Sequence, residues 1–142
     1  MTRYAEGTKV SSEKSQMEIQ QTLKKYGATD VASGEQGDTQ AIIGFRFNRR
    51  AYKIILTHPD PSIFRIASSG RSRTPTQIKE AREQEIRRLW RVMLIVIKSK
   101  LEAAQSGVVS FEEEFLSHIV INANGQTMGE WIKPQLERNV PL

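Results

Sequence analysis

The sequence contains no cysteine, which excludes disulfides, thiolate metal ligands and a cysteine nucleophile, and which suits a reducing cytoplasm. It also lacks a long apolar run. The longest, Val92–Ile97, lies between Arg91 and Lys98, whereas a bilayer span needs about 20 predominantly apolar residues. Residues 1–10 hold no apolar stretch followed by a small-residue cleavage site, so we expect no signal peptide. These absences predict a cytoplasmic protein that crosses no membrane.

Catalytic patterns are equally scarce. The two histidines are His58 and His118, and neither lies in a triad-like or zinc-binding pattern. His118 follows Glu114 by four residues, an ordinary pairing on a helix surface, and a third metal ligand is missing nearby. No glycine-rich phosphate loop and no spaced aspartates occur. We therefore expect no cofactor, no metal and no catalytic residues, although an enzyme of unfamiliar type remains an alternative.

Acidic residues are rare in the middle of the chain. Residues 46–100 carry fourteen Lys and Arg against four Asp and Glu, whereas residues 1–45 carry five against six and residues 101–142 two against six. A concentrated positive region attracts polyanions and speeds their encounter. The charge layout therefore favours nucleic acid as a partner.

Apolar spacing predicts one α+β domain over residues 1–142, in which residues 1–10 form a loose N-terminal arm. The first helix is expected over residues 12–26, with Ser12 as its N-cap and Gly27 after its last turn. Alternating apolar residues then predict an antiparallel meander of three or four strands, at residues 29–33, 40–47, 52–57 and 62–67.

The second half of the chain is predicted to be helical. Thr74 and Gln77 form a capping box that predicts a long helix over residues 75–106. At about 1.5 Å per residue this helix spans roughly 45 Å, so we expect its charged first half to project or the helix to bend. Its apolar middle makes it a candidate subunit contact in a homo-oligomer. Ser110 with Glu113 and Thr127 with Glu130 form two more capping boxes, which predict two short C-terminal helices.

The basic residues of the middle region form the candidate nucleic-acid site. Arginine has a planar fork that suits phosphate and stacks on bases. The arginines of the hairpin tip and of the loop before the long helix lack a local acidic partner, so we expect them to gather into one exposed surface. The helical ones have an ordinary alternative, such as pairing of Glu83 with Arg87. The predicted nucleic-acid-binding residues are Arg46, Arg49, Arg50, Lys53, Arg65, Arg71, Arg73, Arg87 and Arg88.

Aromatic residues make up only 7% of the chain, too few for an obvious stacking platform. We expect Phe45, Phe47 and Tyr52 to pack the core. Trp90 is the candidate stacking residue, although burial is the favoured outcome for it.

Several motifs resemble a group of small phage and prophage proteins. They occur near both ends of the chain, as Arg3–Thr8, Ser15, Leu23–Ala28, Lys98–Glu102, Phe111–Phe115, His118–Val120 and Gly129–Trp131. The resemblance covers nearly the whole chain. It implies a phage context, in the cytoplasm of an infected or lysogenic bacterium, and transfers no functional residues.

The order of one helix, three strands and a long helix is similar to that of Rad52-type single-strand annealing proteins and of double-stranded-RNA-binding domains. Lys79, Arg82, Arg87 and Arg88 are interrupted by three glutamates, which disfavours the RNA-binding module. The leading hypothesis is a non-enzymatic phage accessory protein that binds or anneals single-stranded DNA in replication or recombination. The alternative is a phage protein that binds and inhibits a host protein.

Overall fold

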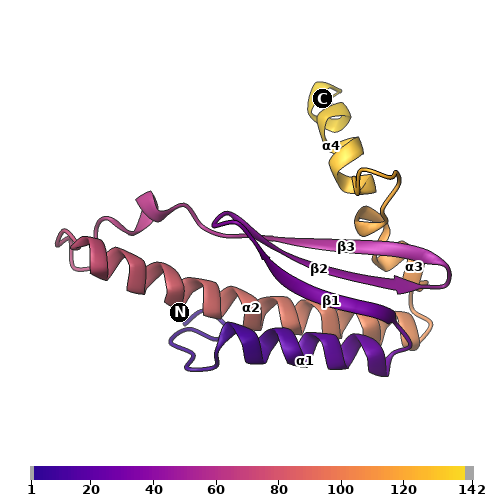
Figure 1. Ribbon diagram of the computed structural model, residues 1–142, viewed down its shortest axis with the longest axis horizontal. Coiled ribbons are helices and arrows are strands. Elements are labelled where there is room, and N and C mark those ends of the chain that lie inside the picture. Colours follow the sequence, from indigo (N-terminus) through magenta and orange to yellow (C-terminus); the bar gives the residue numbers. More distant parts are fainter. Residues whose placement is uncertain (1, 140–142) are drawn as a thin grey trace.

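Serine and threonine residues cap the two long helices, as the sequence predicts. The computed structural model describes residues 2–139 (Figure 1). Ser11, one residue before the predicted cap, accepts a backbone N–H at the start of α1 (Ser12–Lys25). Thr74 begins the predicted capping box, and α2 (Pro75–Gln105) follows it. The hydroxyl groups satisfy N–H groups that have no partner within the helix, so the helices start where these residues stand.

Three strands form one antiparallel sheet in the order β1-β2-β3, which confirms the predicted α+β class. They are β1 (Thr29–Gln36), β2 (Gln40–Phe47) and β3 (Arg50–Thr57). β1 is longer than predicted, because its last three residues still pair with β2. Asn48 and Arg49 both have positive φ angles in the turn between β2 and β3, as a tight two-residue hairpin requires.

Both long helices cover the same face of the sheet and run parallel to each other (Figure 1). Arg91 of α2 contacts Ser15 and Glu18 of α1, and Tyr26 after α1 contacts Glu102 of α2. Phe45, Phe47 and Tyr52 pack in or against the core between the helices and the sheet, as predicted. The large core side chains include Ile19, Leu23, Ile43, Phe45, Tyr52, Ile54, Trp90, Leu94, Ile97, Leu101 and Phe115.

The predicted fourth strand is wrong. The 3-10 helix η1 (Pro61–Phe64) stands in its place, and Asp60 caps η1 by accepting a hydrogen bond of 2.8 Å from the Ser62 N–H. Proline has no N–H to donate to a strand ladder, so the segment after β3 turns away from the sheet. A small hairpin follows, in which Ile66 pairs with Ser72.

The first half of α2 extends past the sheet, as predicted, and the N-terminal arm lies against it (Figure 1). The Arg3 guanidinium is 3.3 Å from the Glu85 carboxylate, and Gln84 donates to the Thr8 carbonyl at 2.9 Å. The arm is therefore held by α2, in place of the loose segment that the sequence predicts. Residue 1 of the predicted arm lies outside the described residues.

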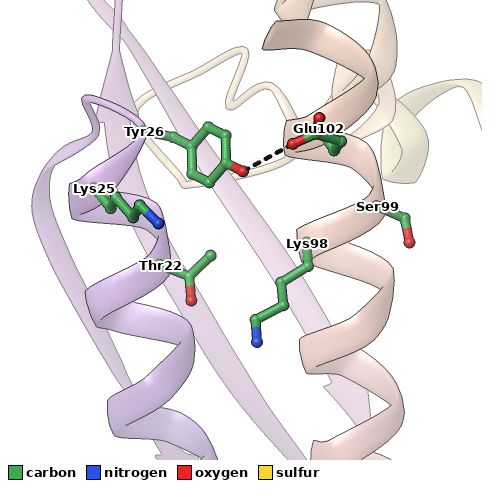
Figure 2. Close-up of a pocket in the computed structure, with 6 residues that line it drawn as sticks. All are labelled: Thr22, Lys25, Tyr26, Lys98, Ser99 and Glu102. Carbon is green, nitrogen blue, oxygen red and sulfur yellow. Dashed lines mark hydrogen bonds between the residues drawn. The ribbon is translucent and has the colours of Figure 1, made fainter. Parts of the chain in front are cut away.

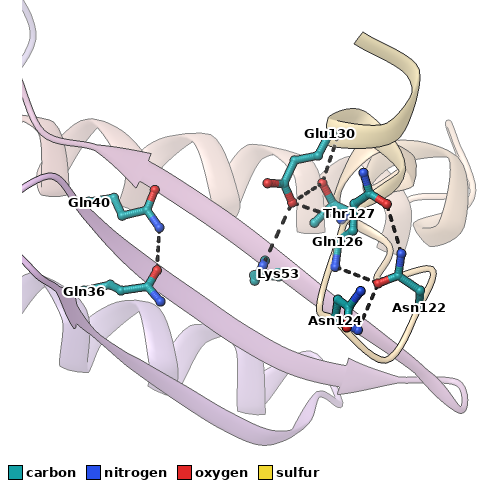
Figure 3. Close-up of polar contacts among 8 residues, drawn as sticks. All are labelled: Gln36, Gln40, Lys53, Asn122, Asn124, Gln126, Thr127 and Glu130. Carbon is teal, nitrogen blue, oxygen red and sulfur yellow. Dashed lines mark hydrogen bonds and ion pairs between the residues drawn. The ribbon is translucent and has the colours of Figure 1, made fainter. Parts of the chain in front are cut away.

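The C-terminal part consists of α3 (Phe111–Glu114), the 3-10 helix η2 (Leu116–His118) and α4 (Met128–Arg138). α4 rises from the side of the sheet that α1 and α2 leave uncovered (Figure 1). Lys53 of β3 lies 3.9 Å from Glu130 at the base of α4, and the capping box of Thr127 with Glu130 fixes the first turn (Figure 3).

Across residues 2–139, no helix combines the length and the apolar character that crossing a membrane would take.

Candidate nucleic-acid interface

The structure separates the basic residues that the sequence predicts to gather. Arg49 and Arg50 lie at the hairpin tip, next to α3 and the end of α2, because Arg50 pairs with Glu112 at 3.1 Å. Arg71 and Arg73 precede the other end of α2. The 31 residues of α2 span about 45 Å, so the two groups lie at opposite ends of the molecule. The expectation of one shared cationic surface is wrong, because β3 carries the chain away from the hairpin tip before α2 begins (Figure 1).

The hairpin-tip group is largely occupied by local contacts. Arg50 pairs with Glu112, and Lys53 lies 3.9 Å from Glu130. The Arg46 guanidinium donates to the Arg49 carbonyl at 3.5 Å. Only Arg46 and Arg49 of this group have no carboxylate partner among the described residues. The tip is thus a weak candidate for polyanion binding.

The two helical arginines of the predicted site serve α2 itself. Arg88 pairs with Glu85 at 2.6 Å, and Arg87 bonds the Gln84 side chain. Each partner lies three residues before its arginine. Arg87 therefore contacts Gln84 instead of the expected Glu83. The hydrogen bond from Arg88 also lowers the pKa of Glu85. Since both side chains are half-buried, we exclude them from the interface.

Trp90 is fully buried, so it cannot stack on a base in the folded protein. Its indole N–H has no hydrogen-bond partner among the described residues. The prediction that Trp90 stacks on a base is therefore wrong, and the favoured alternative, burial in the core, is confirmed.

Residues 65–73, which we call the basic hairpin, carry the remaining predicted arginines. The Ala67 N–H donates to the Arg71 carbonyl, and the Arg73 N–H donates to the Arg65 carbonyl, each at 2.8 Å. Gly70 has a φ of 85° and allows the tight reversal. Arg71 and Arg73 flank Ser72, which pairs with Ile66, so these two side chains share one side of the second arm. Arg65 is the C-cap residue of η1 and has helical φ and ψ angles.

The basic hairpin thus carries three arginines close together in the chain, and none of them has an ion-pair partner among residues 2–139. Arg73 donates to the Phe64 carbonyl at 3.1 Å, which leaves its charge uncompensated. Arg65 and Arg71 are exposed.

A depression of about 390 Å³ lies beside the basic hairpin. Its lining includes Arg71, Arg73 and Ser72 of the hairpin, together with Gln77 and Glu80 of the first turns of α2. The N-terminal turns of α2 line this depression, so the positive end of the helix dipole lies beside it. Glu80 is the acidic member of the lining and limits how far an anion can extend along α2.

Arg82 holds this end of the molecule together, a role that the sequence analysis does not assign. Its guanidinium donates to the Pro59 carbonyl at 2.9 Å and also to the Asp38 carbonyl. It thereby ties α2 to the turn between β1 and β2 and to the segment after β3. Asp60 lies in the same segment, and its pKa is lowered chiefly by the Ser62 N–H, with smaller contributions from Arg65 and Arg82.

A second hollow, of about 660 Å³, lies between the ends of α1 and α2 (Figure 2). Tyr26 donates to Glu102 at 3.1 Å across it, and this hydrogen bond raises the pKa of Tyr26. Lys25 and Lys98 also line it. Thr22 also lines this hollow, and its hydroxyl group donates to the Glu18 carbonyl at 2.7 Å.

Among residues 2–139, no three histidine, aspartate or glutamate side chains come together in a group that could hold a metal ion. The alternative of an enzyme therefore receives no support from a metal site in this part of the chain. Glu114 accepts a hydrogen bond from Lys100 at 3.2 Å, so its partner is a lysine instead of His118. Burial, together with the charge of Lys100, lowers the pKa of His118 below its usual 6.5.

Acidification should therefore destabilise the fold through His118. The unfolded chain binds a proton on this side chain at a higher pH than the folded protein does. The free energy of unfolding should fall as the pH drops below about 6.5, and the loss should stop below the folded pKa. Urea unfolding at a series of pH values measures this. His118→Gln should flatten the dependence in this window, and an unchanged dependence would assign it to other groups.

Comparison with known proteins gives no further assignment: no family model, no curated protein and no solved structure matches this chain.

Proposed function

We propose that this protein is a non-enzymatic nucleic-acid-binding accessory protein that contacts the phosphate backbone of single-stranded DNA through the basic hairpin. The observation that carries the proposal is the set of three arginines within residues 65–73 without an ion-pair partner among the described residues. A phosphate backbone supplies the missing negative charge. A role in phage replication or recombination, including annealing, belongs to the same proposal.

The surroundings of the hairpin favour a single strand over a duplex. Glu80 and Glu83 are exposed on the first turns of α2, so this helix would bring negative charge against the phosphates if it entered a groove. A flexible strand can follow the hairpin and stay clear of them. No aromatic side chain belongs to residues 65–73, so stacking adds little. Binding should be independent of base sequence and dominated by counterion release.

Fluorescence anisotropy with labelled single-stranded and duplex oligonucleotides tests the proposal. We expect a dissociation constant for the single strand within the range of non-specific binders, about 10⁻⁴–10⁻⁶ M. Arg65→Gln combined with Arg71→Gln should weaken binding about tenfold, by the same factor for every base sequence. These two side chains make no hydrogen bond with the rest of the described chain, so the fold should survive the change.

The matched control removes two charges from the opposite end. Arg46→Gln combined with Arg49→Gln gives the same net charge and leaves the basic hairpin intact. The affinity of this variant should stay within about twofold of wild type, because charges beyond a Debye length of roughly 10 Å are largely screened. Equal losses in both double variants would mean that only net charge matters, and the hairpin would lose its assigned role.

A further inference from the structure

The segment between β3 and α2 presents two isoleucines to solvent. Ile63 and Ile66 are 64% and 56% exposed. Ile63 and Phe64 belong to η1, and Arg65 after them also has helical φ and ψ angles. Because side chains three residues apart are eclipsed in a 3-10 helix, the two isoleucines, which we call the isoleucine pair, lie side by side. The segment stands beyond the sheet, at the end of the molecule where α2 begins (Figure 1).

The short helix η1 has three sides, and its side chains divide among them. With three residues per turn, Phe64, Arg65 and the isoleucine pair point in directions about 120° apart. Phe64 is half-buried, and η1 packs on α2, so this side faces the rest of the domain. Arg65 and the isoleucine pair occupy the two other sides, and all three side chains are exposed. A cationic side and an apolar side therefore lie next to each other and face solvent.

The charges around the isoleucine pair favour an anionic partner. Arg65, Arg71 and Arg73 have no ion-pair partner among the described residues. Asp60 is the only acidic residue in the sequence between β3 and α2, and its carboxylate is occupied in capping η1. An apolar surface bordered by unpaired cations fits a ligand that combines negative charge with apolar groups.

A nucleotide of a single strand has this combination. Its phosphate carries the charge, and the face of its unpaired base is accessible to an apolar or aromatic side chain. In a duplex, the base faces are hidden in the stack. Isoleucine is among the apolar residues that proteins place against bases. Since every base has such a face, this contact adds affinity without a preference for base sequence.

We propose that the isoleucine pair contacts unpaired bases while Arg65 contacts the adjacent phosphate, and that this apolar contact selects single strands over duplexes. The inference rests on the proposed function and names the residues that recognise the unpaired state. Phosphate contacts alone cannot supply this selectivity, because a duplex has the higher density of phosphate charge. The base contact adds an attraction that only a single strand can use.

Anisotropy titrations of oligothymidine and of an abasic strand of the same length test the base contact. The two strands carry the same phosphates, so only the bases differ. The wild type should bind oligothymidine about tenfold more tightly, because partial burial of two isoleucines is worth about that factor. Ile63→Ser combined with Ile66→Ser should bind both strands with the affinity that the wild type has for the abasic strand. Its salt dependence should be unchanged, because no charge is removed.

Two further variants serve as controls. Val108 is 77% exposed beyond the other end of α2, so Val108→Ser should leave both affinities unchanged. Ile66→Phe makes the opposite change, because an aromatic ring stacks on a base. It should tighten binding of oligothymidine about fivefold and leave binding of the abasic strand unchanged. The replaced side chains are largely exposed, so the variants should fold as the wild type does, which circular dichroism checks.

The possible failures are distinguishable. A double serine variant that keeps the wild-type affinity for oligothymidine overturns the base contact, and so do equal losses for both strands. A variant that loses binding only to phosphatidylserine vesicles would assign the isoleucine pair to a lipid surface and overturn it as well. A wild type that binds both strands equally contradicts the base contact alone. A wild type that binds neither strand contradicts the proposed function itself.

Discussion

Replacing Trp90 with alanine should lower the free energy of unfolding by about 3–5 kcal/mol, the usual range for a large aromatic residue in a core. Trp90 is completely buried between the two long helices and the sheet. Its removal leaves a cavity that the surrounding helices can close only in part. Since domains of this kind have total stabilities of about 5–15 kcal/mol, the variant should lose a large part of its stability. Urea unfolding followed by circular dichroism measures the change.

The second tryptophan of the chain provides the control. Trp131 is 47% exposed on α4, so Trp131→Ala should cost the monomer less than about 1 kcal/mol. Trp90→Phe should cost much less than Trp90→Ala, because it keeps most of the volume and removes an indole N–H that has no partner among the described residues. Equal costs at residues 90 and 131 would be incompatible with the core described above.

Raising the salt concentration should weaken single-strand binding steeply. Each phosphate contact contributes a slope of about −0.7 to the plot of log affinity against log salt for a single strand. Three to four contacts, from the three arginines and the N-terminus of α2, give a slope of about −2 to −3. Affinity should then fall about 20–50-fold between about 50 and 200 mM salt. Anisotropy titrations at four or five salt concentrations provide the slope.

The variants refine this expectation. Arg65→Gln with Arg71→Gln should reduce the magnitude of the slope by about 1.4, because two contacts are lost. Arg46→Gln with Arg49→Gln should leave it unchanged. A wild-type slope close to zero would exclude phosphate contacts as the source of affinity.

Local chemistry made the elements of this fold predictable. The caps at Thr74 and Thr127 and the alternation of apolar residues in β2 and β3 depend on neighbours in the sequence, and the structure has them where the sequence predicts them. The prediction of a fourth strand was wrong because Asp60 and Pro61 favour a capped 3-10 helix at this position. Prediction of the core aromatic residues succeeded, since one face of each strand is continuously apolar.

The arrangement of the candidate site was less predictable, because it depends on strand direction and length. β3 is eight residues long, so it carries the chain about 27 Å away from the hairpin tip at roughly 3.4 Å per residue. The length of β3 alone places Arg49 and Arg71 far apart. The contacts of Arg50 with Glu112 and of Lys53 with Glu130 join distant parts of the chain, and no sequence spacing reveals them.

Binding through the basic hairpin is tested most directly by mapping the bound surface onto the chain. Amide chemical shifts of the isotope-labelled protein should be followed by nuclear magnetic resonance during titration with a single-stranded oligonucleotide. The largest shifts should fall in residues 65–79, which include the basic hairpin and the first turn of α2, and residues 46–50 should change little. Shifts centred on the hairpin tip or on α4, or none at all at saturating oligonucleotide, would contradict the proposed interface.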